Sequence, residues 1–232
     1  FLKERMLFDV TLFSDGSNIQ RKPKGHLYLY PLIAIAAMLA IVFVMDLPHM
    51  HKPKQQLSQT IRIPAGQRAQ MDLPDGSIVW LNSQTTLTYD ENFGKKDRKV
   101  TLDGEAYFEV AHNKEIPFYV QTENIKVQVT GTKFDVCSYK GSNSFIARLI
   151  EGSINLLTNN AKEEKPITSL TKGKYFSMEN GKYKTGEMSS NNALAWMQGI
   201  YYFDDVPFKE LLDKIALYYN YKITVNNPKI LE

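Results

Sequence analysis

Cysteine is nearly absent from this chain: Cys137 is the single one in 232 residues. An internal disulfide is therefore excluded, and the folded part must be held together by its own core. A large excess of positive charge is also missing, because 28 Lys and Arg face 25 Asp and Glu, for a net charge of +3. A charge this small, with no basic patch, argues against nucleic acid as a direct partner.

Several other patterns are missing. The turn signals fall at uneven spacing, which argues against a solenoid or propeller of fixed period. No nucleophile and base stand in a recognisable constellation, so we do not expect an enzyme. His49, Met50 and His51 form a small cluster, but they lack the preorganised further ligands of a specific metal site. We expect no metal and no cofactor.

One long apolar run is present, from Leu27 to Leu47, with Asp46 as its single charge. About 20 apolar residues in a helix span the hydrocarbon core of a bilayer. A buried core helix would more often show a polar face. The following DLPHMHKPK has no small-residue cleavage site, so we expect a retained transmembrane helix over 27–47 rather than a signal peptide. Arg21, Lys22 and Lys24 favour a cytoplasmic N-terminus.

From Ile61 to about Met188 the chain alternates short apolar runs with turn dipeptides, a pattern typical of antiparallel β structure. We expect a mainly β, sandwich-like domain over 61–188, behind a linker over 48–60. Hairpin turns are predicted at four dipeptides: Asp75-Gly76, Asp103-Gly104, Gly141-Ser142 and Asn180-Gly181.

Alternation within these runs predicts which residues face the core. The expected inward positions are Val100, Leu102, Ala106, Phe108, Val110, Phe118 and Val120. In IKVQVTGTKFDV the phase slips by one, because Ile125, Val127 and Val129 share one phase while Phe134 and Val136 share the other. We expect a β-bulge at 130–132, with Gly131 supplying unusual dihedral angles.

After about residue 189 the pattern changes to strand, helix, strand. Pro207 is expected to start the helix, whose apolar face recurs at a 3.6-residue period from Phe208 to Tyr219. The expected strands are IYYFDD before the helix and YKITVNN after it. This small β-α-β module over 189–232 has too few elements to bury both its faces, so we expect it, like the tail over 1–26, to be truncated.

These residues resemble the FecR-like anti-sigma regulators of Gram-negative bacteria. The resemblance rests on IPAGQRAQMDLPDGSIVWLNSQTTLTYDENF, on VTLDGEAYFEVAHNKEIPFYVQTENIKVQVTGTKFDV, and on the later ARLIEGSINL and LTKGKYFSM. The region from Trp196 through Gly199 and Phe203 to the last strand is similar to the small C-terminal domain of such regulators.

The resemblance implies a single-pass protein of the bacterial inner membrane, with a cytoplasmic N-terminus and periplasmic C-terminal domains. Its cytoplasmic segment would hold an extracytoplasmic-function sigma factor. Its periplasmic part would sense the signalling domain of a TonB-dependent outer-membrane transporter, in iron or glycan uptake. Segment 1–26 is shorter than the family's sigma-binding region, so that activity is expected of the parent protein.

Three sets of residues are candidates for specific roles. Some relatives cleave themselves at a Gly-Thr bond that matches Gly131-Thr132, where the Thr132 hydroxyl would attack the Gly131 carbonyl; a structural bulge is the simpler interpretation and is favoured. Asp103, Glu105 and Glu109 share one side of a strand and are expected to be its solvated face rather than paired catalytic acids. Aromatic side chains are expected to contact a partner or the core: Tyr201, Tyr202, Phe203 and Phe208.

Two other functions stay open. A membrane-tethered periplasmic scaffold that binds glycan or envelope components would need no sigma partner. A membrane-anchored hydrolase that uses the acidic strand would lose turnover when Glu105 or Glu109 is replaced by Gln.

Overall fold

The computed structural model describes residues 29–50, 57–159, 164–188, 191–203 and 206–231. They belong to two compact units, Phe1–Gln55 and Gln56–Glu232, each described by itself. The predicted tail over 1–26 and His51 lie outside the described residues.

The first unit contains α1 (Leu29–Met50), which includes most of the apolar run. Pro31 lies in its first turn, where the missing N–H costs little. Among the residues that the structure describes, no helix combines the length and apolar character needed to cross a membrane. The span over 27–47 therefore stays a prediction.

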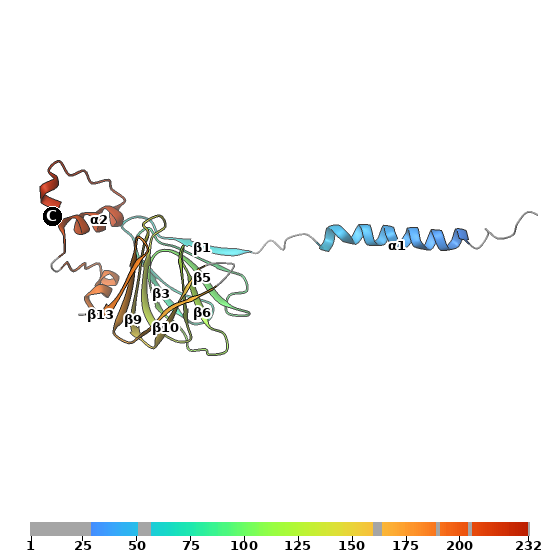
Figure 1. The fold of residues 1–232 in the computed structure, drawn as a ribbon, viewed down its shortest axis with the longest axis horizontal. Helices are drawn as coiled ribbons and strands as arrows, with labels where there is room; N and C mark the ends of the chain where they lie inside the picture. The colour runs from blue at the N-terminus through green and yellow to red at the C-terminus, as the bar shows by residue number, and fades with distance from the viewer. Residues whose placement is uncertain (1–28, 51–56, 160–163, 189–190, 204–205, 232) are drawn as a thin grey trace, which may run out of the picture. The chain divides into compact units, whose positions relative to one another are not determined.

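The second unit is mainly β and contains a 13-stranded sheet that curls around one core (Figure 1). Its first half, sheet A, consists of β1 (Ser58–Arg62), β4 (Thr86–Asp90), β5 (Arg98–Glu109), β6 (Phe118–Gln121), β7 (Ile125–Val129), β10 (Ser153–Thr158) and β11 (Pro166–Thr171). Sheet B consists of β2 (Ala69–Asp72), β3 (Ile78–Leu81), β5 again, β8 (Lys133–Ser138), β9 (Ser144–Glu151), β12 (Lys174–Glu179) and β13 (Lys182–Glu187).

Strand β5 joins the two sheets. Its first half pairs with β4 and β6, and its second half pairs with β3 and β8. The β5–β6 pair is parallel, so the sheet is mixed rather than wholly antiparallel as predicted. Parallel pairing needs a connection that brings the chain back to the end of the sheet where β5 began. Residues 110–117 form this connection between β5 and β6.

The predicted inward residues are confirmed as core. All seven are buried, from Val100 and Leu102 in sheet A to Ala106 and Phe108 in sheet B. Phe108 stacks on Phe134 with ring centroids 5.1 Å apart and meets Phe118 edge-on at 5.9 Å, so aromatic contacts link the two sheets. Aromatic pairs at such distances add about 0.5–1.5 kcal/mol beyond their burial.

Three of the four predicted turns are confirmed, at Asp75-Gly76, Gly141-Ser142 and Asn180-Gly181, which connect β2–β3, β8–β9 and β12–β13. The turn at Asp103-Gly104 is wrong, because β5 runs through it and passes there from sheet A to sheet B. Gly104 has φ 133°. A Cβ on it would lie 2.4 Å from Thr85 Oγ1, so the strand's close approach to residue 85 needs glycine.

The predicted bulge at 130–132 is also wrong. Strand β7 ends at Val129 in sheet A and β8 begins at Lys133 in sheet B, so residues 130–132 carry the chain between the sheets and the phase changes with the crossing. The register irregularity lies between Lys133 and Phe134, against β9. Gly131 is not in the left-handed region, so it supplies space rather than unusual dihedral angles.

In the C-terminal region, the predicted helix is confirmed and the predicted strands are wrong. Helix α2 (Phe208–Tyr219) follows Pro207, and the 3₁₀ helices η1 (Asn191–Gln198) and η2 (Pro228–Leu231) flank it. The described residues of IYYFDD, 200–203, and residues 221–226 form no strand. They pair with no neighbouring strand, and an extended segment without ladder hydrogen bonds is not stabilised as β structure.

Candidate partner-binding site

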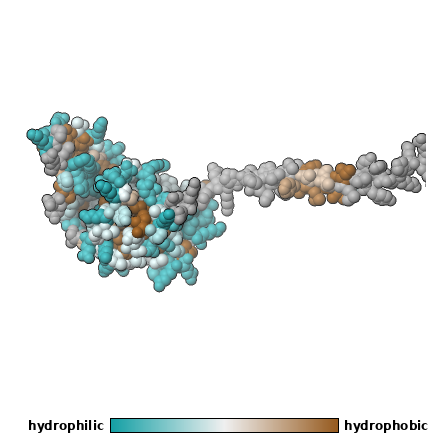
Figure 2. Space-filling view, viewed as in Figure 1, coloured by the Kyte–Doolittle hydropathy of each residue, from teal (hydrophilic) through white to brown (hydrophobic). Residues whose placement is uncertain are grey.

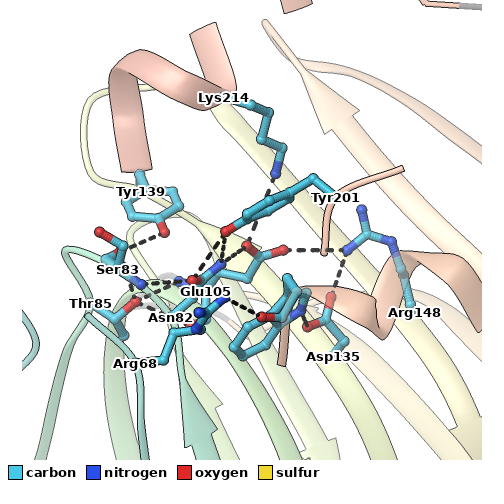
Figure 3. Close-up of polar contacts among 11 residues, drawn as sticks. Arg68, Asn82, Ser83, Thr85, Glu105, Asp135, Tyr139, Arg148, Tyr201 and Lys214 are labelled. Carbon is cyan, nitrogen blue, oxygen red and sulfur yellow. Dashed lines mark hydrogen bonds and ion pairs between the residues drawn. The ribbon is translucent and has the colours of Figure 1, made fainter. Parts of the chain in front are cut away.

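The C-terminal cap, defined as the described residues of 191–219, lies over the outer face of sheet B. The outward side chains on this face come from β5, β8 and β9, whose register places Glu105 beside Cys137 and Asp135 beside Arg148. Residues far apart in the sequence therefore meet between the sheet and the cap (Figure 3).

Glu105 is the centre of this contact. Its side chain is 4 % exposed, and Asn82 Nδ2 donates a hydrogen bond to Glu105 Oε2 at 2.7 Å. Arg148 Nη1 lies 3.8 Å from Glu105 Oε1, and Lys214 Nζ on α2 lies 4.0 Å from Oε2. A buried carboxylate persists when opposite charges and donors surround it, as they do here. The attraction of Glu105 also raises the pKa of Lys214.

Asp135 lies beside this group on β8, with a fully buried side chain. Arg148 Nη1 donates to Asp135 Oδ2 at 2.6 Å, and Trp196 Nε1 in the cap donates to Oδ1 at 3.3 Å. Burial raises the pKa of Asp135 to about 7, with Arg148 opposing the shift and Glu105 adding to it. Arg148 therefore lies between two carboxylates that compete for one cation.

The C-terminal end of α2 rests on two loops of the β domain. The carbonyl of Tyr218 accepts hydrogen bonds from Ser83 Oγ at 2.6 Å and from Gly66 N at 2.8 Å. Gln84 Nε2 donates to the carbonyl of Leu217. The last carbonyls of a helix lack partners within the helix, so these donors satisfy groups that water would otherwise hold.

Tyr201 and Tyr139 complete the polar contacts. Asn82 Nδ2 donates to Tyr201 Oη at 3.1 Å, and Tyr139 Oη donates to the carbonyl of Ser83 at 2.9 Å. Burial raises the pKa of both phenols, so both stay protonated and able to donate.

An open groove of about 760 Å³ lies beside this network, between the outer face of sheet B and the cap. Its sheet wall includes Ile146, Tyr175 and Ser177, and its cap wall includes Tyr201, Tyr202, Phe203 and Val206. Charged side chains such as Glu179, Lys184 and Glu210 also line it, so the groove offers both aromatic and polar groups to a partner. Figure 2 shows apolar residues distributed among polar ones on the visible face of the second unit.

The structure brings three of the four aromatic residues that were predicted to contact a partner or the core to this groove. Tyr201, Tyr202 and Phe203 line it, and Phe208, at the start of α2, is 42 % exposed and not among its lining residues. No partner chain tests their role, so it stays a prediction.

The predicted solvated face on β5 is wrong for Glu105, because the cap covers the second half of the strand. Asp103 and Glu109 are half-buried. Asp103 accepts a hydrogen bond from Lys140 N at 2.8 Å, and Glu109 pairs with Lys133 at 3.3 Å. These contacts to the β domain leave the three carboxylates in separate surroundings, without the arrangement of paired catalytic acids.

The Gly131-Thr132 peptide is held by contacts other than those of this network. Thr132 is buried, and its Oγ1 donates to the carbonyl of Ser153 at 3.0 Å. A Cβ on Gly131 would lie 2.4 Å from His112 Nδ1, so His112 packs directly on this peptide. Self-cleavage here stays a prediction.

The sequence reasoning missed Asp135, Arg148 and Lys214. Asp135 and Arg148 carry opposite charges in consecutive strands, and both alternate with inward-facing apolar residues. This pattern could have predicted an ion pair on the outer face of the sheet. Lys214 gave no such signal, because its partner Glu105 is distant in the sequence.

Comparisons with known proteins agree with this fold. Residues 59–155 match the family model described as FecR protein. Two crystal structures, at 2.50 and 1.65 Å, of a proposed anti-sigma factor from Parabacteroides distasonis ATCC 8503 are similar to this chain, each at 26 % identity and a TM-score of 0.62. The alignments cover 71 % and 70 % of this chain, and 76 % and 75 % of the other chains. No curated protein matches the chain.

Proposed function

We propose that this chain, whose residues 59–155 match the FecR family model, is a membrane-anchored anti-sigma factor that holds an extracytoplasmic-function sigma factor on the cytoplasmic side. The observation that carries the proposal is the FecR match over 59–155, which coincides with strands β1 to β10. The similarity to the Parabacteroides protein extends over 71 % of the chain and supports it.

The proposed anchor is the apolar run Leu27–Leu47. It is supported by its length, which fits a bilayer, and by the single charge within it. Arg21, Lys22 and Lys24 before the run support a cytoplasmic N-terminus and a periplasmic second unit in the inner membrane. Segment 1–26 would then belong to the side that reaches the sigma factor.

On the periplasmic side, the proposed partner is the signalling domain of a TonB-dependent transporter. Tyr201 and Phe203 are the residues proposed to contact it, because both line the groove between the cap and sheet B. Aromatic side chains in a concave site supply contact area at low entropic cost. For a signal to cross the membrane, this contact must change the populations of conformational states that differ in how the cytoplasmic segment binds the sigma factor.

The proposed role is regulatory, because FecR is not a family of enzymes. Self-cleavage at Gly131-Thr132 would be a single event that leaves no turnover. Expression of the Thr132→Ala variant tests it: a fragment ending at Gly131 that disappears in the variant supports cleavage, and an unchanged fragment pattern contradicts it.

The test of the anti-sigma proposal is purification of the tagged full-length protein from membranes, with mass spectrometry of the proteins that co-purify. We expect a sigma factor that is lost when segment 1–26 is deleted. Phe203→Ala is the matched control, because it changes the groove and should leave the sigma factor bound. Recovery of envelope proteins or glycans alone would contradict the proposal and favour the scaffold.

A further inference from the structure

The cap is held to sheet B with little apolar burial. Among the described residues of 191–231, Trp196 is the single fully buried side chain, at 2 % exposure. Helix α2 has no buried residue. Of its apolar positions, Phe208, Ile215 and Tyr219 are 42 %, 39 % and 53 % exposed, and the others, from Leu211 to Tyr218, are only half-buried. The β core, by contrast, contains more than a dozen apolar side chains at 1 % exposure or less.

Besides the hydrogen bonds at the end of α2 and at Tyr201, two polar contacts join the cap to buried carboxylates of sheet B. Trp196 Nε1 on η1 donates to Asp135, and Lys214 on α2 faces Glu105. Arg148 connects these two carboxylates, at 2.6 Å from Asp135 and 3.8 Å from Glu105. The η1 contact and the α2 contact therefore share one cation, although the two helices are separate in the sequence.

At the end of α2, one of the residues that contact the helix has an unfavourable backbone conformation. Gln84, which donates to the Leu217 carbonyl, has φ 57°, in the left-handed region that non-glycine residues rarely adopt. Such a conformation persists where surrounding contacts hold it. Release of α2 would remove one of these contacts and let residue 84 relax.

We propose that the cap is a releasable latch: η1 and α2 leave the outer face of sheet B together, while the β core stays folded. Regions with few buried apolar contacts open at a lower free energy than the core. Because Arg148 connects the η1 and α2 contacts, loss of one weakens the other.

The test uses the full chain in detergent, with Trp80→Phe so that Trp196 is the single tryptophan. Quenching of Trp196 fluorescence by acrylamide then reports exposure of η1. Lys214→Met removes the cation on α2 and keeps its methylene stem, and Lys209→Met is the matched control because exposed Lys209 pairs with Asp213. We expect the quenching constant to rise at least twofold in Lys214→Met and to stay unchanged in Lys209→Met.

Amide hydrogen exchange separates release from unfolding. We expect Lys214→Met to accelerate exchange in α2 at least fivefold while β5 and β8 keep their protection. Ser83→Ala, which removes a donor to the Tyr218 carbonyl, should act in the same direction. Unchanged Trp196 quenching in both variants would overturn the coupling of η1 to α2. Equal acceleration in α2, β5 and β8 would overturn release as a separate event.

Discussion

Arg148 Nη1 on β9 lies 2.6 Å from Asp135 Oδ2 on β8, and the Asp135 side chain has no exposed surface. This pair is covered on the outer face of sheet B by Trp196 of the cap. A structural ion pair in such a place contributes little net stability by itself, but the loss of one partner leaves an uncompensated charge. The pair therefore makes the attachment of the cap sensitive to single substitutions.

Above about pH 7, where Asp135 is ionised, Arg148→Met should destabilise the second unit by about 3–5 kcal/mol, because Asp135 and Glu105 would then be buried without their shared cation. Chemical denaturation followed by circular dichroism measures this. Lys209→Met is the control and should change the free energy of unfolding by less than about 0.5 kcal/mol, because exposed ion pairs contribute little. An equal effect of the two substitutions would contradict the role of Arg148.

The second unit should lose stability as the pH rises from about 4 to about 7. The pKa of Asp135 is raised to about 7 in the folded state from 3.8, so in this window the folded state binds a proton that the unfolded state has lost. Stability falls with pH wherever the folded state binds more protons. Thermal unfolding from pH 4 to 8 measures the trend, and Asp135→Asn should flatten it. The same slope in the variant would show that other groups cause it.

Gly131→Ala should destabilise the protein more than Gly141→Ala. At Gly131 the new Cβ would lie 2.4 Å from His112 Nδ1 and 2.8 Å from His112 Cα, so backbone must move. At Gly141 there is open space, and the cost comes from φ 78° alone, which is about 1 kcal/mol. We expect Gly131→Ala to cost at least about 2 kcal/mol. The reverse order of melting temperatures would contradict this packing.

If the proposed partner, the signalling domain of a transporter, binds in the groove, Phe203→Ala should weaken its binding about tenfold, because aromatic residues dominate interface energies. Calorimetry with the purified signalling domain measures this. Tyr183→Ala is the control, because Tyr183 is 71 % exposed and is not among the residues that line the groove. Equal affinities for the wild type and both variants would show that the signalling domain does not bind in the groove.

The local sequence determined the β character of the domain over 61–188, most of its predicted turns and α2. Alternation at Val100 and Leu102 predicted the core face because the side-chain period of a strand is two. Asn180-Gly181 predicted its hairpin because both residues accept positive φ, which they have at 48° and 78°. Pro207 and the 3.6-residue period predicted α2 because both act within the helix itself.

Tertiary structure decided where these elements go. Asp103-Gly104 has the sequence of a turn, but Gly104 lies within β5, where the strand passes from sheet A to sheet B. Glycine is needed there because Thr85 approaches the strand too closely for a Cβ. The predicted strands at 200–203 and 221–226 did not form because no neighbour pairs with them. Glu105 has the outward phase of a solvated residue and is buried because the cap, which begins 86 residues later at Asn191, folds back over it. Burial on that face depends on contacts between segments distant in the chain, which alternation within one strand cannot report.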